Sequence, residues 1–108
     1  MAREIKQLGI VNPASDTDTE IFEQGTAGLF LVSVTAANKG LEDARVDVWI
    51  VPSASANQVG YITSNLILPG RNSYETQKFT LTYSDSIYVR STSSSVSFIT
   101  SGINQTET

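Results

Sequence analysis

Apolar and polar residues alternate along most of this chain with a period of two. The pattern is clearest over residues 29–36, where Phe30, Val32 and Val34 point to one side of an extended strand. We expect that side to face the core. No window sustains the i, i+3, i+4, i+7 spacing of an amphipathic helix. The chain is therefore predicted to consist almost entirely of β-strands.

About eight alternating segments follow one another, each short and bounded by turn-forming residues. They are predicted to be strands over residues 4–11, 20–24, 29–36, 44–51, 59–68, 74–81, 85–91 and 95–101. The turn Asn38-Lys39-Gly40 predicts a hairpin between the third and fourth segments, and Pro69-Gly70 predicts a further reversal. This many short strands in 108 residues favours an all-β fold, an antiparallel two-sheet sandwich or jelly roll.

The chain length allows one domain. Domains commonly span roughly 100–150 residues, and this chain has 108. We expect a single β-sandwich domain with an N-terminal arm over residues 1–102. Residues 103–108 end in Asn104-Gln105-Thr106-Glu107-Thr108 and offer few apolar anchors, so they are predicted to form a flexible polar tail.

Two residue types, histidine and cysteine, do not occur in the sequence. Their absence excludes Ser-His-Asp triads, Cys-His pairs, disulfides and the common zinc sites. No glycine-rich phosphate loop leads into a predicted helix, and no cofactor is expected. We therefore expect that the protein is not an enzyme.

The charge balance argues against two classes of partner. Eleven acidic and seven basic residues give a net charge of −4, the wrong sign for a chain that gains affinity by neutralising phosphates or anionic lipid. No stretch approaches the roughly 20 apolar residues needed to span a bilayer. We expect binding neither to nucleic acid nor to membranes.

Three carboxylates, at Asp16, Asp18 and Glu20, are spaced two residues apart. In an extended segment they would face one side and could offer hard oxygen ligands to Ca²⁺. The segment lacks the central glycine and the distal glutamate of a helical calcium loop. Ca²⁺ is therefore a candidate ligand here, and a solvated loop that leads into a strand is the competing interpretation.

Candidate partner-binding residues surround a small polar loop that follows Pro52. Trp49, the single tryptophan, faces away from the apolar side of its strand, so it is either exposed for recognition or packed in a second layer. The loop includes Asn57 and Gln58, and Tyr61 follows on the next predicted strand. Loop tips are where variable contacts usually lie. These four residues are candidate partner contacts, and ordinary packing is the competing interpretation for the two aromatic ones.

Seven strand-and-turn segments follow one another in a recognisable order. They are Gly28-Leu29-Phe30-Leu31-Val32-Ser33-Val34, Ala37-Asn38-Lys39-Gly40, residues 46–52, Leu66-Ile67-Leu68-Pro69-Gly70, Thr80-Leu81-Thr82, residues 84–91 and Val96-Ser97-Phe98. In this order, and over residues 8–102, the chain resembles small β-sandwich virion structural proteins of tailed bacteriophages. Members commonly have Gly before the Asp of the late turn, where this sequence has Ser84.

The resemblance implies a virion structural protein without catalytic residues. It would be an accessory or decoration component of the capsid or neck, present as a homo-oligomer or in many copies. Its partners would be other virion proteins, and its location would be the virion. Two alternatives stay open. One is a tail or fibre-attachment component, and the other is a carbohydrate- or receptor-binding module that uses Trp49, the polar loop over residues 53–58 and the tyrosines, which are Tyr61, Tyr74, Tyr83 and Tyr88.

Overall fold

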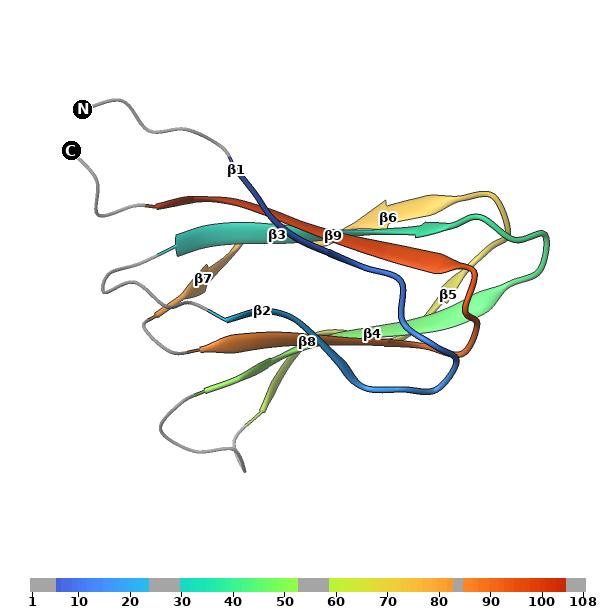
Figure 1. Ribbon diagram of the computed structural model, residues 1–108, viewed down its shortest axis with the longest axis horizontal. Helices are drawn as coiled ribbons and strands as arrows, with labels where there is room; N and C mark the ends of the chain where they lie inside the picture. Colours follow the sequence, from blue (N-terminus) through green and yellow to red (C-terminus); the bar gives the residue numbers. More distant parts are fainter. Residues whose placement is uncertain (1–5, 24–29, 53–58, 83–84, 105–108) are drawn as a thin grey trace.

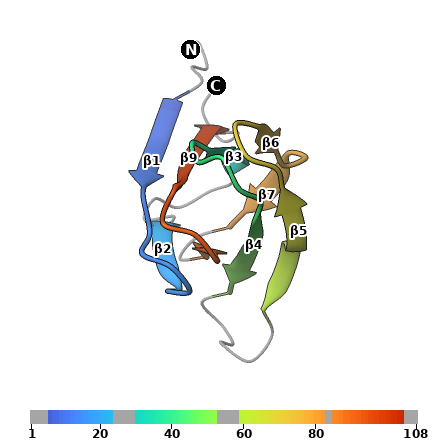
Figure 2. The ribbon, with the colours of Figure 1, turned by 90° about the vertical axis from the view of Figure 1, so that its right-hand side faces the viewer.

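The structure is a computed structural model that describes residues 6–23, 30–52, 59–82 and 85–104. Within these ranges the chain forms two antiparallel sheets that pack face to face, as Figure 1 and Figure 2 show. The strands are β1 (Lys6–Val11), β2 (Thr19–Glu23), β3 (Phe30–Asn38), β4 (Ala44–Val51), β5 (Gly60–Leu68), β6 (Ser73–Glu75), β7 (Phe79–Leu81), β8 (Ser86–Ser91) and β9 (Val96–Asn104). The described residues contain no helix, and hence none long and apolar enough to cross a membrane. The predicted all-β, two-sheet fold is confirmed.

The strand order is that of a jelly roll. One sheet, called sheet A here, has the order β1-β9-β3-β6, with β7 also paired to β3; the other, sheet B, has the order β2-β8-β4-β5. The chain passes back and forth between the sheets from β1 to β4 and again from β5 to β9. Because β6 and β7 pair with opposite halves of β3, they fill one strand position between them. The nine strands therefore occupy eight positions, the number expected of a jelly roll with two Greek keys.

The predicted hairpin between the third and fourth strands is wrong. β3 lies in sheet A and β4 in sheet B, so the turn after Asn38 carries the chain across the sandwich. The buried Asn38 side chain shapes this corner: its Nδ2 donates to the carbonyl oxygens of Glu42 at 2.8 Å and Leu68 at 3.0 Å, and its Oδ1 accepts from the Gly40 amide at 3.0 Å. The residues Asn and Gly signal a turn, but they do not determine which sheet the chain enters next.

The strand predicted over residues 74–81 is interrupted between β6 and β7. Thr76 causes the break, because the Val34 amide donates to Thr76 Oγ1 at 3.0 Å and the Thr76 amide donates to the Val34 carbonyl at 2.9 Å. The hydroxyl thus takes the place of a backbone carbonyl in the ladder, and regular pairing with β3 stops until Phe79. The alternating pattern of the sequence does not reveal this exchange.

One apolar core fills the space between the sheets. Its fully buried members, each at most 1% exposed, are Val32, Val34, Val46, Val48, Leu81, Ile87, Val89, Val96 and Phe98. The inward face predicted for β3 is confirmed at Val32 and Val34, and Phe30 packs partly buried against the core. Burying one such side chain contributes about 1.5–3 kcal/mol. The fold is therefore stabilised mainly from between the two sheets, and the outer face of each sheet can serve as a contact surface.

Both ends of the described chain lie in sheet A. The arm predicted at the N-terminus is β1, which pairs antiparallel with β9 and places Ile10 opposite Ile99. β9 continues to Asn104, because the backbones of Ile103 and Asn104 pair with β3. Residues 103 and 104 are therefore part of the sheet and not of a tail, and residues 105–108 lie outside the described residues.

Candidate functional site

The sequence candidates Trp49 and Tyr61 lie together on the outer face of sheet B. They occupy paired positions on β4 and β5, and Tyr88 holds the position paired with Trp49 on β8. The centroid of the Trp49 ring lies 5.5 Å from that of Tyr61 and 5.9 Å from that of Tyr88, with interplanar angles of 27° and 20°. Since β4 lies between β5 and β8, the rings form a stacked row across three strands. We call Tyr61, Trp49 and Tyr88 the aromatic row.

Stacking leaves Trp49 with little accessible surface. Trp49 is 8% exposed, whereas Tyr61, at the outer end of the row, is 54% exposed. A sugar-binding platform needs an exposed ring face, and the two tyrosines cover both faces of the Trp49 ring. The arrangement fits packing for Trp49 and leaves Tyr61 as the accessible aromatic side chain of the row.

Carboxylates flank the other end of the row. Glu20 on β2 pairs with Tyr88 on β8. The pKa of the Tyr88 phenol is raised, chiefly by partial burial, and further by the negative charge of Glu20, a hydrogen bond to Glu20 and the charges of Glu23 and Asp18. The Tyr88 phenol therefore keeps its proton to a higher pH than an ordinary tyrosine does.

Asp16 and Asp18 contact Arg90 and are not gathered with Glu20 into a calcium site. Arg90 Nη1 lies 2.9 Å from Asp18 Oδ1, and Arg90 Nη2 lies 3.8 Å from Asp16 Oδ1. The hydrogen bond that Arg90 donates to Asp18 is the largest cause of the raised pKa of Arg90. Asp16 has a φ of 56°, so the segment is not regularly extended at this residue, and Asp16 and Asp18 both face the Arg90 guanidinium. Among the described residues, no three acidic side chains are placed to hold a metal ion.

The remaining sequence candidates, Asn57 and Gln58, lie outside the described residues. Tyr61 borders a pocket of about 330 Å³ where the edge of sheet B approaches the segment between β6 and β7. Tyr74, Gln77 and Lys78 contribute the other polar groups of that pocket. Among the sequence candidates, Tyr61 therefore lies at a pocket of the described surface.

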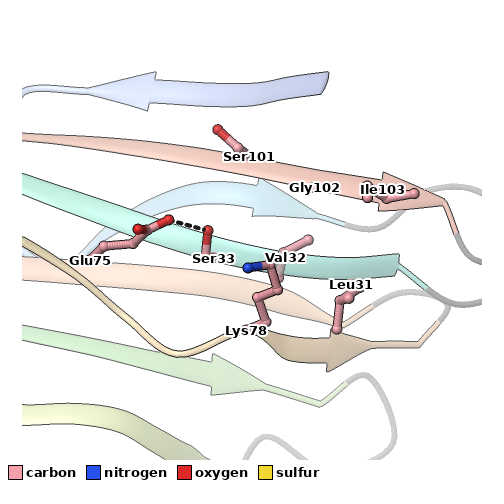
Figure 3. A pocket seen from close by; sticks show the side chains of 8 residues that line it. All are labelled: Leu31, Val32, Ser33, Glu75, Lys78, Ser101, Gly102 and Ile103. Atoms are coloured by element: carbon pink, nitrogen blue, oxygen red, sulfur yellow. Dashed lines mark hydrogen bonds between the residues drawn. The ribbon is translucent and has the colours of Figure 1, made fainter. Parts of the chain in front are cut away.

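A second surface, which the sequence reasoning missed, is the outer face of sheet A. It carries a pocket of about 280 Å³ lined by apolar Leu31 and Ile103 and by polar Ser33, Glu75 and Lys78 (Figure 3). Ser33 Oγ donates to Glu75 Oε2 at 3.1 Å across β3 and β6. The sequence does contain a sign of this face. The outward positions of β9 are Ser97, Ile99, Ser101 and Ile103, and none of them carries a charge.

The sheet edges are irregular, in contrast with the central strands. β1 and β2 each contain one register shift, and β5 contains two, next to Asn65 with a φ of 53°. The fourth edge position is the broken strand β6–β7. The central pairs β3–β9 and β4–β8 show no shift. Bulges and breaks hinder the pairing of a foreign strand, so the faces and loops are better suited than the edges to contact a partner.

Comparisons with known proteins give a fold relationship. No family model matches the chain, and no curated protein matches it. Among solved structures, a chain from the structure of infectious bursal disease virus, Gx strain, is similar with a TM-score of 0.54 at 9% sequence identity. The similarity covers 98% of this chain and 35% of the viral chain, so this chain spans about a third of the viral chain's length. The whole jelly roll of this chain is therefore a fold that also occurs in a virus structure.

Proposed function

We propose that this chain is a structural protein of a virus particle that acts through protein–protein contacts. The observation that carries the proposal is the strand order, a complete jelly roll that matches part of a chain in a virus structure over 98% of its own length. Jelly rolls also occur in lectins and cupins, and a fold by itself does not determine function. The sequence resemblance to tailed-bacteriophage virion proteins favours a structural role in a virus particle over a lectin or cupin function.

Within the particle we propose an accessory role on the outer capsid or neck of a tailed bacteriophage. A domain of this size with a net charge of −4 is suited to adding to a preformed shell and poorly suited to wrapping nucleic acid. The chain has no histidine or cysteine for the common nucleophilic mechanisms. The Ser33 hydroxyl donates to Glu75 in a pocket that Lys78 also lines, and this group of residues lacks the histidine base that activates a serine in the common triads. We therefore propose a role without catalysis.

Immunogold electron microscopy of particles from a culture that carries the gene tests this function. Antibody raised against the full chain is expected to label intact particles at the head or neck. Labelling confined to the tail or its fibres would favour the tail or fibre-attachment alternative and would overturn the capsid assignment. An absence of label on both intact and detergent-opened particles, with label on the free purified chain, would contradict the virion role itself.

A further inference from the structure

We propose that the outer face of sheet A pairs with the same face of a second copy of this chain. The proposal rests on the proposed function for its biological setting, because it names the surface through which a many-copy virion protein contacts itself. Three observations carry it: the distribution of charge, the shape of the face and its size. The irregular edges described above direct the contact to a face and away from strand addition.

Charge is distributed unequally between the two outer faces. On the described strands of sheet A, Glu75 is the one ionisable side chain at an outward position, and Lys78 lies at the rim between β6 and β7. The outward positions of sheet B carry several charges of both signs, namely Glu20, Glu23, Arg45, Asp47 and Arg90. A chain with net charge −4 repels its own copies. The face of sheet A can therefore be buried against itself at a lower cost in like charges than sheet B, with one Glu75 from each copy.

The same face carries a protruding side chain and a hollow. Ile10 on β1 is 53% exposed and lies beside Ile99 of β9. The pocket bordered by Leu31 and Ile103 lies further along β9, on the side of β3, so the strand β9 separates it from Ile10. Ser101 lies between the two features. A two-fold axis in the contact plane through Ser101 brings Ile10 of each copy to the pocket of the other, so that the contact is made twice.

The face is large enough for a stable pair. The face holds six residues of β1, nine each of β3 and β9, and three each of β6 and β7, and at about 3.3 Å per residue and 4.8 Å per strand it spans roughly 480 Å² in projection. A standard interface buries about 800 Å² of accessible surface per partner, and accessible surface exceeds projected area because side chains make it uneven. The outer face of sheet A therefore supplies most of a standard interface without help from the loops.

Analytical ultracentrifugation of the full chain tests the pairing. We expect a concentration-dependent shift toward twice the monomer mass. Ile10→Lys should weaken the association at least about tenfold, since it removes the apolar side chain that enters the pocket and brings a charge that must lose its water there. The matched control is Ile67→Lys, because Ile67 is 49% exposed on the outer face of sheet B and should leave the association unchanged. Circular dichroism of both variants verifies that each is folded.

Cross-linking through introduced cysteine gives a second readout, since the chain has none of its own. Ser101→Cys, near the expected axis, should form dimers with a short bis-maleimide linker, whereas Ser64→Cys on β5 of sheet B should not. A chain that stays monomeric at about millimolar concentration would overturn the pairing. So would an equal change in association for the two lysine variants, or an equal yield of cross-linked dimer for the two cysteine variants. If the chain is monomeric in solution but is found on particles, the pairing is refuted and the virion role stands. If the chain forms the dimer but is absent from particles, the virion role is refuted and the pairing stands.

Discussion

The side-chain amide of Asn38 donates a hydrogen bond of 3.0 Å to the carbonyl oxygen of Leu68, 30 residues away. Asn38 ends β3 in sheet A and Leu68 ends β5 in sheet B, so this bond joins the two sheets at one corner of the sandwich. Ser95 Oγ, from the loop between β8 and β9, donates to the Asn38 Oδ1 at 2.9 Å. One buried side chain therefore connects three loops at the same end of the fold.

Asn38→Ala is expected to lower the free energy of unfolding by about 2–4 kcal/mol, because it leaves buried carbonyl and amide groups without partners. Asn38→Asp should cost a similar amount, since a carboxylate cannot donate to the carbonyls of Glu42 and Leu68. Urea denaturation followed by Trp49 fluorescence measures both. Equal stability of the wild type and Asn38→Asp would show that the two donated bonds contribute nothing.

Trp49→Ala is expected to lower the free energy of unfolding by about 3 kcal/mol, as removal of a buried large aromatic side chain does. Tyr61→Ala, at the exposed end of the aromatic row, should cost about 1 kcal/mol or less. A glycan array probed with the wild-type chain should show no binding that depends on Trp49. Tight glycan binding lost in Trp49→Phe, a variant that keeps a stacked ring, would favour the carbohydrate-binding alternative.

The buried hydroxyl of Thr100 has no hydrogen-bond partner among the residues that the structure describes, although Thr100 is 0% exposed. Thr100→Val keeps the shape and removes the unpaired polar atom, so it should raise the free energy of unfolding by about 1 kcal/mol. Thr76→Val is the matched control, because Thr76 Oγ1 accepts a hydrogen bond from the Val34 amide. That control should be destabilised by about 1–3 kcal/mol. The same sign for both substitutions in thermal or urea unfolding would refute this assignment.

The raised pKa of Tyr88 predicts a stability that depends on pH at the alkaline end. Because the folded state holds this proton more tightly than the unfolded state, the stabilising effect is complete below the ordinary tyrosine pKa of about 10 and is lost as pH rises through the higher folded value. Ultraviolet titration of tyrosinate should show a late component that is missing in Tyr88→Phe. Glu20→Gln should lower the pKa of that component, and an unchanged titration in Glu20→Gln would refute the contribution of the Glu20 charge.

The sequence was sufficient to predict the strands and most of the inward face, because burial between two sheets imposes alternation directly on residues such as Val32 and Val34. It was not sufficient to predict the pairing of strands. The corner at Asn38 and the break at Thr76 depend on side-chain hydrogen bonds to residues at least 30 positions away, Leu68 and Val34, and such partners leave no local pattern.

The candidate site was predicted in part. Trp49 and Tyr61 do lie together, but Tyr88 joins them only through the pairing of β4 with β8, which is not visible in the sequence. The carboxylates of Asp16 and Asp18 were expected to gather with Glu20, but both contact the Arg90 guanidinium, and no three acidic side chains of the described residues are placed to hold a metal ion. The outer face of sheet A could have been noted from the uncharged alternation along β9.

Quantitative mass spectrometry of gradient-purified particles from a culture that carries the gene tests the virion role most directly. The account predicts that this chain co-purifies with the particles through successive density gradients, in a constant ratio to the major coat protein and in many copies per particle. A chain that is abundant in the producing cells but absent from the purified particles, or present there in a ratio that falls with each gradient, would contradict it.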